Sequence, residues 1–416
     1  MAGLASPLSR RILRPLQGSG RIREGSPEIA GAAGASCRPW DDGPACARPC
    51  IAHSPLVAEQ ALARGRWVKL IGGASNQDLA AIEDLAGLYS LAGVHCLDLA
   101  ADQAVVAAAR RGIAWAENQG AARPWLMVSL SDGADPHFRK AWFDPTRCPP
   151  SCPRPCARVC PALAIPTPIG ALGAGAGSDS GSGVLAERCY GCGRCLPACP
   201  LGLIEERDHN LPPDQVAALL VELCPDAVEL HTRLGRAEAF AERLAQVCSS
   251  GVPLRRLAVS CGLESAVSAQ GAGVSPELPT PEALARELWQ RHEQVLHTGL
   301  APLWQLDGRP MSGDVGAGTA RAAVRLLAAV APLAPPGPLQ LAGGTNDRTL
   351  PLVQRLDPDL QRAVAGVAFG SVARARLQPL LLQAQGRGGR LLDQPDLLPL
   401  ASAIARELVG PWLARD

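Results

Sequence analysis

The chain has 416 residues, enough for one large domain or two ordinary ones. Its formal net charge of +1 gives no electrostatic reason to expect nucleic acid or an anionic membrane as a partner. Hydrophobic residues make up 47% of the chain and support a substantial core. No stretch of about eighteen apolar residues lacks a charge or a proline, so no transmembrane helix is predicted.

Residues 1–63 are predicted to be a disordered extension. The run Ser9–Arg14 resembles a twin-arginine export signal, but polar residues follow it where an apolar segment would be needed. An organelle transit peptide stays open as an alternative. Cys37, Cys46 and Cys50 lie here without a full set of metal-ligand spacings. Export is therefore not expected, and the abundant cysteines, taken with the clusters predicted below, indicate a reducing cytoplasm.

Short apolar runs alternate with helical patterns from Trp67 onward, and eight of the runs predict strands. These runs are Val68–Gly73, Cys96–Leu99, Trp125–Leu130, Ala227–His231, Arg256–Cys261, Leu303–Leu306, Leu339–Ala342 and Val364–Phe369. Helical patterns lie between them, for example at Glu282–His297 and Thr319–Val330. Eight strands that each lead to a helix predict a (β/α)8 barrel. A doubly wound open sheet shares the alternation and is the alternative.

Eight of the fifteen cysteines form two blocks between the third and fourth predicted strands. The second block reads Cys189-x-x-Cys192-x-x-Cys195-x-x-x-Cys199-Pro200. This is the spacing of a bacterial ferredoxin, in which three cysteines bind one iron–sulfur cluster and the fourth binds the other. The first block departs from it, because three-residue gaps separate all its cysteines. Its members are Cys148, Cys152, Cys156 and Cys160, followed by Pro161.

The two blocks together predict two [4Fe–4S] clusters with crossed ligation. One cluster would be held by Cys148, Cys152, Cys156 and Cys199. The other would be held by Cys189, Cys192, Cys195 and Cys160. The irregular first block leaves a [3Fe–4S] cluster open at its site. Zinc and disulfide frameworks are the alternatives, but neither is typical of a four-cysteine run that ends in Cys-Pro.

The ferredoxin-like segment, residues 148–207, is thus predicted to interrupt a barrel formed by residues 64–147 and 208–416. An insertion after the third strand opens at the C-terminal face, where the active sites of barrel enzymes lie. Four further cysteines fall in strand or helix patterns, where packing in the core is the usual role of a free thiol. They are Cys96, Cys224, Cys248 and Cys261.

Glycine-rich turns follow the last two predicted strands. Gly343, Gly344 and Thr345 come after the seventh strand, and Gly370 and Ser371 come after the eighth. Many barrels bind a phosphate group at these two turns through backbone amides and a helix N-terminus. The turns therefore predict a site for a phosphate-containing ligand such as FMN, with tight chain reversal as the plain alternative.

Other polar residues lie at or just after the C-terminal ends of the predicted strands, where a ligand at the barrel mouth would meet them. They are Ser75, Asn76, Asp98, Asp102, His231, Thr232, Cys261, Asp307 and Arg309. Asp102 is predicted to be a helix N-cap. His231 is predicted to be either a proton donor or ligand, or a hydrogen-bonded core histidine. The loop Asp307–Asp314 joins a cation and two acids with flexible glycines, which fits a binding loop or an ordinary turn.

Four stretches of the chain resemble the cyanobacterial light-dependent period A (LdpA) family. They read WVKLIGGASNQDLAAIEDLAGLYSLAGVHCLDLAAD, WQLDGRPMSGDVGAGTARAAV, LQLAGGTN and GVAFGSVARARL. The resemblance runs from about Arg66 to Leu382 and includes both cysteine blocks. It implies an iron–sulfur protein of redox and light input to the circadian clock, acting near the Kai oscillator and its input kinase. It implies the eight block cysteines as cluster ligands and names no catalytic residue. Some relatives have cysteine where this chain has Gly72.

Three functions are consistent with these features. A redox sensor would receive electrons from a donor such as the quinone pool or a ferredoxin, and the charge of its clusters would alter a nearby surface. An oxidoreductase would pass single electrons to a flavin or another phosphorylated cofactor at the barrel mouth. A plain electron carrier would have little use for a large barrel. The resemblance favours the sensor.

Overall fold

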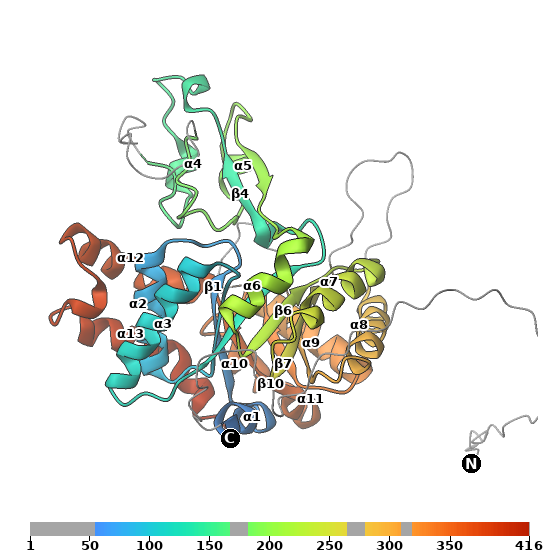
Figure 1. Ribbon diagram of the computed structural model, residues 1–416. Helices are drawn as coiled ribbons and strands as arrows, with labels where there is room; N and C mark the ends of the chain where they lie inside the picture. Colours follow the sequence, from blue (N-terminus) through green and yellow to red (C-terminus); the bar gives the residue numbers. More distant parts are fainter. Residues whose placement is uncertain (1–54, 167–181, 264–278, 309–317, 416) are drawn as a thin grey trace, which may run out of the picture. The chain divides into compact units, whose positions relative to one another are not determined.

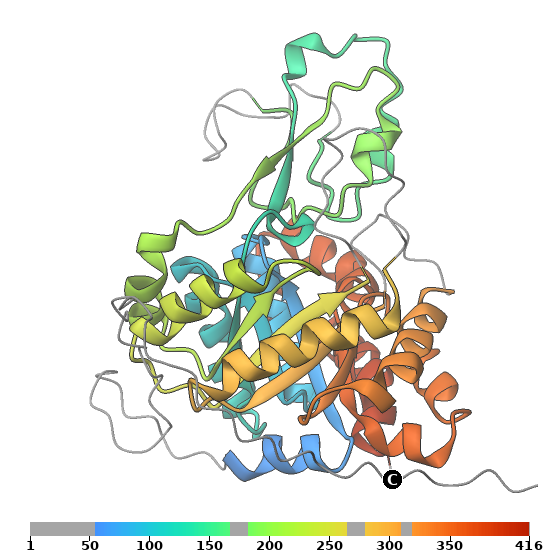
Figure 2. The same ribbon diagram turned by 90° about the vertical axis from the view of Figure 1, so that its right-hand side faces the viewer.

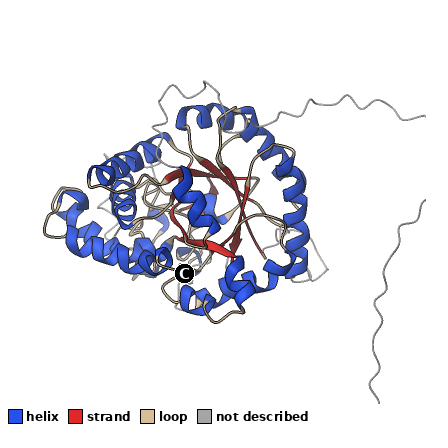
Figure 3. Cartoon of the chain, turned by 90° about the horizontal axis from the view of Figure 1, so that it is seen from below, coloured by secondary structure: helices blue, strands red, loops and turns tan. Residues whose placement is uncertain are grey.

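The computed structural model describes residues 55–166, 182–263, 279–308 and 318–415. Its eight parallel strands close into a barrel in the order β1-β10-β9-β8-β7-β6-β3-β2, with helices around the outside (Figures 1 and 3). The strands are β1 (Trp67–Gly73), β2 (Cys96–Ala100), β3 (Trp125–Ser131), β6 (Ala227–His231), β7 (Arg256–Gly262), β8 (Pro302–Asp307), β9 (Leu339–Ala342) and β10 (Val364–Phe369). The eight predicted strands and the predicted barrel are confirmed.

Pairing of the first and last strands decides between the barrel and the open sheet. Trp67 to Leu70 of β1 lie in parallel register with Gly366 to Phe369 of β10. The chain reaches β6 from β3 only after the cysteine region, and these two strands pair directly. The sheet therefore has no edge strand, and the predicted doubly wound alternative is excluded.

Helices cover the outer surface of the barrel, where buried leucines, valines and alanines of strands and helices form the main core. The helices between strands, with those that close the chain, are α2 (Leu79–Ala92), α3 (Gln103–Asn118), α6 (Val216–Leu223), α7 (Ala237–Ser249), α8 (Pro281–Leu296), α9 (Thr319–Val330), α10 (Thr349–Val353), α11 (Pro358–Ala363), α12 (Ser371–Gly386) and α13 (Leu398–Leu413). Asp102 caps α3 by accepting the Val105 amide at 3.0 Å, as predicted.

The helix α1 (Pro55–Ala63) corrects the predicted extent of the disordered extension, because the last nine residues of 1–63 are helical. Ala58, Ala61 and Leu62 are buried in one cluster with Trp67 and Trp125, which begin their strands. Figure 3 shows this helix lying across the end of the barrel. Burial of its small apolar face explains why the segment is ordered despite a composition that suggests otherwise.

The cysteine region is a small separate lobe between β3 and β6 (Figure 2). Two antiparallel strands, β4 (Arg139–Trp142) and β5 (Glu205–Asp208), enter and leave it, with Trp142 opposite Glu205. Two single-turn helices, α4 (Pro155–Arg158) and α5 (Cys195–Ala198), carry cysteines. Apolar residues such as Phe143, Ile165 and Ile204 pack with those cysteines in a core of their own. The paired strands show that the lobe extends slightly beyond the predicted 148–207.

A half-buried histidine just before β2 should make the stability of the barrel fall in mild acid. His95 Nδ1 accepts the Val68 amide at 3.1 Å, its ring stacks on Trp67, and burial lowers its pKa from 6.5 to about 4. The unfolded chain therefore binds this proton at a higher pH than the folded chain does. The contribution is fully present above pH 6.5 and is lost as the pH falls toward 4, a loss of about 3 kcal/mol.

Urea unfolding at pH 7 and at pH 4.5 measures this loss. The matched variant His95→Asn keeps an acceptor for the Val68 amide but does not titrate, so the pH-dependent loss should be smaller in it by that amount. Equal losses in the two proteins would contradict the role assigned to His95.

Candidate iron–sulfur centre

The cysteines of the first block lie near Cys199, the last cysteine of the second block. Burial raises the pKa of the Cys148 thiol, and the nearby Cys152 and Cys199 raise it further. Burial raises the pKa of the Cys156 thiol, and the nearby Cys199, Cys148 and Cys152 raise it further. Cys199 follows α5, and its Sγ accepts the Leu203 amide at 3.4 Å. These four thiols thus form one group, although Cys199 belongs to the other block in sequence.

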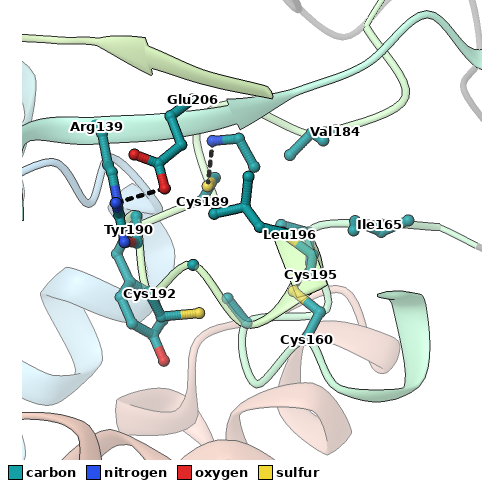
Figure 4. Close-up of a pocket in the computed structure, with 15 residues that line it drawn as sticks. Arg139, Cys160, Ile165, Val184, Cys189, Tyr190, Cys192, Cys195, Leu196 and Glu206 are labelled. Carbon is teal, nitrogen blue, oxygen red and sulfur yellow. Dashed lines mark hydrogen bonds and ion pairs between the residues drawn. The ribbon is translucent and has the colours of Figure 1, made fainter. Parts of the chain in front are cut away.

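The remaining four cysteines form a second group. Burial raises the pKa of Cys195 to about 12, and Cys189, Cys192 and Cys160 add to this effect. The four side chains line one pocket, and Figure 4 shows them around it. The structure therefore brings together both sets of cysteines that the crossed spacing predicts.

Glycines give the loop of the second block its shape. Gly191 and Gly193 alternate with the cysteines and adopt φ angles of 73° and 74°, which favour glycine. A Cβ atom at Gly191 would lie 2.3 Å from the Arg139 carbonyl oxygen of β4. Arg139 in turn donates from Nε to the Gly191 carbonyl at 3.1 Å. The loop is therefore held tightly against β4, and its cysteines face one space.

The chemistry of both groups fits iron–sulfur clusters. Each offers four soft sulfur donors, which is the ligand set of a [4Fe–4S] cluster. Backbone amides also point at the sulfurs: the amides of Ala141 and Ala164 donate to Cys189 and Cys160, each at 3.3 Å. Such bonds stabilise negative charge on sulfur. The raised thiol pKa values reflect burial together with mutual repulsion, and cluster iron would favour the thiolates instead.

The lobe contacts the C-terminal ends of the first strands through specific bonds. The Arg374 guanidinium of α12 lies 4.0 Å from the ring centroid of Tyr190, the residue after Cys189. Its Nη2 donates to the Gly72 carbonyl of β1 at 2.8 Å. The backbone amide of Gln77 donates to the backbone carbonyl of Glu187 at 3.0 Å. Arg374 was not predicted, because no sequence signal places a helix residue against a distant cysteine loop.

A buried charge network fills the barrel interior. Lys69 Nζ lies 3.0 Å from Asp98 and also contacts Glu229, and all three side chains are almost fully buried. Burial opposes the charge on Lys69, but these two carboxylates outweigh it and raise its pKa. Ser129 donates to Asp98 at 2.7 Å, and Gln305 donates to Glu229 at 2.9 Å.

Only Asp98 in this network was among the predicted site residues. Lys69 and Glu229 were missed, although a charged residue at an inward position of an otherwise apolar strand is a usable signal. His231 Nε2 lies 3.0 Å from Glu229 Oε1, so the network continues to the end of β6. Glu229, with Asp135 and Asp307, raises the pKa of His231 to about 9 despite its burial.

The other predicted site residues have structural partners. Asn76 donates to the Gly72 carbonyl at 3.0 Å, and Thr232 accepts from Arg291 at 3.3 Å. Ser75 donates to the Arg139 carbonyl at 3.4 Å. Asp307, at the end of β8, accepts from Ser260. Arg309 and the rest of the predicted loop to Asp314 lie outside the described residues.

Among the other cysteines, Cys96 and Cys261 are buried, as predicted. Cys224, which ends α6, and Cys248 in α7 are disulfide-bonded instead of free, so the prediction of free packing thiols is wrong for both.

Backbone conformation and close packing explain the glycines of the turn after β9. Gly343 and Gly344 have φ angles of 62° and 93°, and a Cβ at Gly344 would lie 2.8 Å from Thr319 Cβ. The Thr345 hydroxyl donates to the Ala368 carbonyl. Gly370 precedes α12, which begins at Ser371 without a side-chain cap. Tight reversal accounts for the first turn, and phosphate binding at either turn stays a prediction.

The fold and the cysteine lobe together define a (β/α)8 barrel protein with an inserted iron–sulfur cluster-binding domain. Residues 148–210 match the family description LdpA Fe-S cluster-binding domain, and residues 219–411 match the light dependent period A C-terminal domain. The chain is 44% identical over 364 residues to light dependent period A of Synechococcus elongatus, covering 86% of this chain and 94% of the relative.

The chain therefore belongs to the light-dependent period A family, and it carries that family's iron–sulfur cluster-binding domain. Some solved structures are similar at much lower levels. A geranylgeranylglyceryl phosphate synthase from Thermoplasma acidophilum shares 9% identity at a TM-score of 0.36, over 85% of this chain and 98% of that one. A fructose-bisphosphate aldolase from Plasmodium falciparum shares 11% at 0.39, over 86% and 93%. These likenesses carry no argument about ligands. No helix among the described residues is long and apolar enough to cross a membrane.

Proposed function

We propose that the chain is a redox sensor that holds two [4Fe–4S] clusters by crossed ligation. Cys148, Cys152, Cys156 and Cys199 hold one cluster, and Cys160, Cys189, Cys192 and Cys195 hold the other. The observation that carries the proposal is the grouping of Cys199 with the first block and of Cys160 with the second. The irregular gaps of the first block leave its cluster open to a [3Fe–4S] form.

The residues between the second group and the barrel support a sensing role. When bound, the clusters supply reversible one-electron transfer. Tyr190 lies within the second cysteine group and packs under Arg374, whose guanidinium also binds the end of β1. A change of charge at these cysteines would thus change the electrostatic energy of the Arg374 guanidinium, which is part of the barrel. The contact between Arg374 and the Tyr190 ring would then become weaker or stronger, and α12, which carries Arg374, would respond.

The partners follow from family membership. A relative is called light dependent period A, and we infer that this chain likewise acts in light input to a circadian clock, with clock input and oscillator proteins as its targets. A soluble carrier such as a ferredoxin, or the quinone pool, is the proposed electron donor. The cytoplasm is the compartment in which such partners would be met.

An oxidoreductase is the second candidate, and a pocket at the barrel mouth favours it. The pocket has a cavity volume of about 250 Å³ and is lined by residues including Gln77, Asp102, Ser129, Phe138 and His209. It is large enough for part of a cofactor. A phosphate-containing ligand such as FMN, bound at Gly343, Gly344, Thr345, Gly370 and Ser371, would lie at the same C-terminal face.

Hydrogen exchange separates the two candidates. The protein is purified without oxygen, assayed for flavin, and compared in its oxidised and dithionite-reduced states. A sensor predicts no flavin, together with altered exchange in α12 and the Tyr190 loop on reduction. Arg374→Gln should lose the change in α12 and keep the change around the cysteines. One bound flavin per chain would support the oxidoreductase, whereas identical exchange in both states would contradict the sensor.

A further inference from the structure

Three side chains with metal-ligating atoms meet where the cysteine lobe joins the barrel. Asp135 and His137 lie between β3 and β4, His137 within the single-turn 3-10 helix Pro136–Phe138, and His231 ends β6. One donor atom of each lies within 4.8 Å of the other two. None of the three belongs to the cysteine groups, so the cluster site leaves them unassigned.

Backbone bonds and ring packing hold these donors in place. Asp135 Oδ1 accepts the His137 amide at 2.8 Å and lies 2.7 Å from His137 Nδ1. The rings of His137 and His231 are 4.8 Å apart between centroids. Phe138 packs edge-on against His231 at 5.2 Å. The three donors therefore come together because the segment between β3 and β4 packs against the end of β6.

The Glu229 carboxylate contacts the ring of His231. Its Oε1 lies 3.0 Å from His231 Nε2, and its side chain is fully buried. Gln305 and Lys69 bind the same carboxylate and fix its position. Metal-ligating histidines usually give one ring nitrogen to such a carboxylate, which orients the ring and leaves the other nitrogen for the metal. His231 is therefore arranged as a ligand would be.

The charge around the histidines is also suited to a cation. Asp307 is buried, lies close enough to interact electrostatically with His137 and His231, and accepts hydrogen bonds from Ser260 and Gln305. Within the described ranges, no lysine or arginine forms an ion pair with it. Burying a carboxylate is costly unless it is paired with a cation, and a dication held by the two histidines would pair with Asp307 in place of the protonated His231 ring. Arg233 Nε lies 3.6 Å from Asp135 Oδ2.

We propose that Asp135, His137 and His231 bind one divalent first-row transition-metal ion at the barrel mouth, separate from the clusters. Imidazole and carboxylate ligands suit Zn²⁺ and Fe²⁺, and two histidines with one carboxylate leave coordination positions open to water or a small ligand. The site ties the strand that leads into the lobe to β6. The rival interpretation is that both histidines only form ion pairs with Asp135 and Glu229.

Equilibrium dialysis of the full chain against Zn²⁺ tests the site. The protein is prepared without oxygen, treated with a mild chelator, and assayed for zinc, iron and sulfide together, so that loss of clusters is detected separately. The intact protein should bind one zinc per chain while its iron and sulfide stay constant. His137→Ala removes one of the three ligands and should weaken this binding by more than about tenfold. The variant should still fold, because the His137 side chain is partly exposed.

Two further variants complete the test. Asp135→Asn should weaken zinc binding as His137→Ala does, with unchanged far-ultraviolet circular dichroism. The matched control is His209→Ala, which removes another histidine near the base of the lobe but outside the three donors. Failure of the intact protein to bind zinc would overturn the proposal. So would binding that His137→Ala and His209→Ala affect equally, since the metal would then lie elsewhere.

Discussion

Cys199→Ala is expected to remove the cluster of the first cysteine block and to leave the cluster of its own block intact. Cys199 groups with Cys148, Cys152 and Cys156 and lies outside the pocket lined by the other four cysteines. A cluster that loses one of its four thiolates loses iron or falls apart, whereas its neighbour keeps a full ligand set. About half of the iron and sulfide should therefore be lost.

Electron paramagnetic resonance of the reduced protein identifies the surviving cluster. Cys160→Ala should remove the signal that Cys199→Ala retains, and retain the one that Cys199→Ala removes. Cys261→Ala is the matched control, because this buried cysteine lies in β7, away from both groups. Crossed ligation would be refuted if Cys199→Ala and Cys192→Ala gave the same surviving signal.

The second large effect is expected from Lys69→Met in the barrel interior. Lys69 is fully buried between Asp98 and Glu229. Removing it leaves two buried carboxylates without their cation, which costs roughly 3–5 kcal/mol of the free energy of unfolding. Chemical unfolding of the cluster-loaded protein without oxygen measures the loss.

Two comparisons show whether the loss comes from the uncompensated charges. Adding Asp98→Asn and Glu229→Gln to Lys69→Met should recover part of the stability, because the two carboxylate charges that lost Lys69 are then removed. Arg362→Met removes an exposed arginine from α11 and should leave the free energy of unfolding nearly unchanged. A Lys69→Met variant as stable as the parent would show that the network contributes nothing.

Much of the fold could be predicted from the sequence because its signals are local. Each strand is a short apolar run closed by a helix signal, and β6 and β9 begin and end at the predicted residues. The cysteine spacing likewise predicts the ligand sets, since short gaps limit which thiols can bind the same cluster. Helix α1 was missed because its small apolar face is recognisable only against Trp67 and Trp125.

The residues that could not be predicted act across the fold. Arg374 meets Tyr190 only because α12 and the cysteine loop lie at the same end of the barrel. Asp135 and His137 look like ordinary loop residues until the barrel brings β6 beside β3. Lys69 and Glu229 are single charges within apolar runs, and only barrel closure pairs them. A single charge in an apolar strand marks such a position in the sequence, but which residue pairs with it across the fold leaves no pattern.

The most direct test of the account is the count of iron and acid-labile sulfide in protein purified without oxygen. Two [4Fe–4S] clusters predict about eight iron atoms and about eight sulfides per chain. About seven iron atoms with about eight sulfides would place a [3Fe–4S] cluster at one of the two sites and keep the crossed ligation. Zinc on the cysteines with no sulfide would contradict the central claim that these eight thiols hold iron–sulfur clusters.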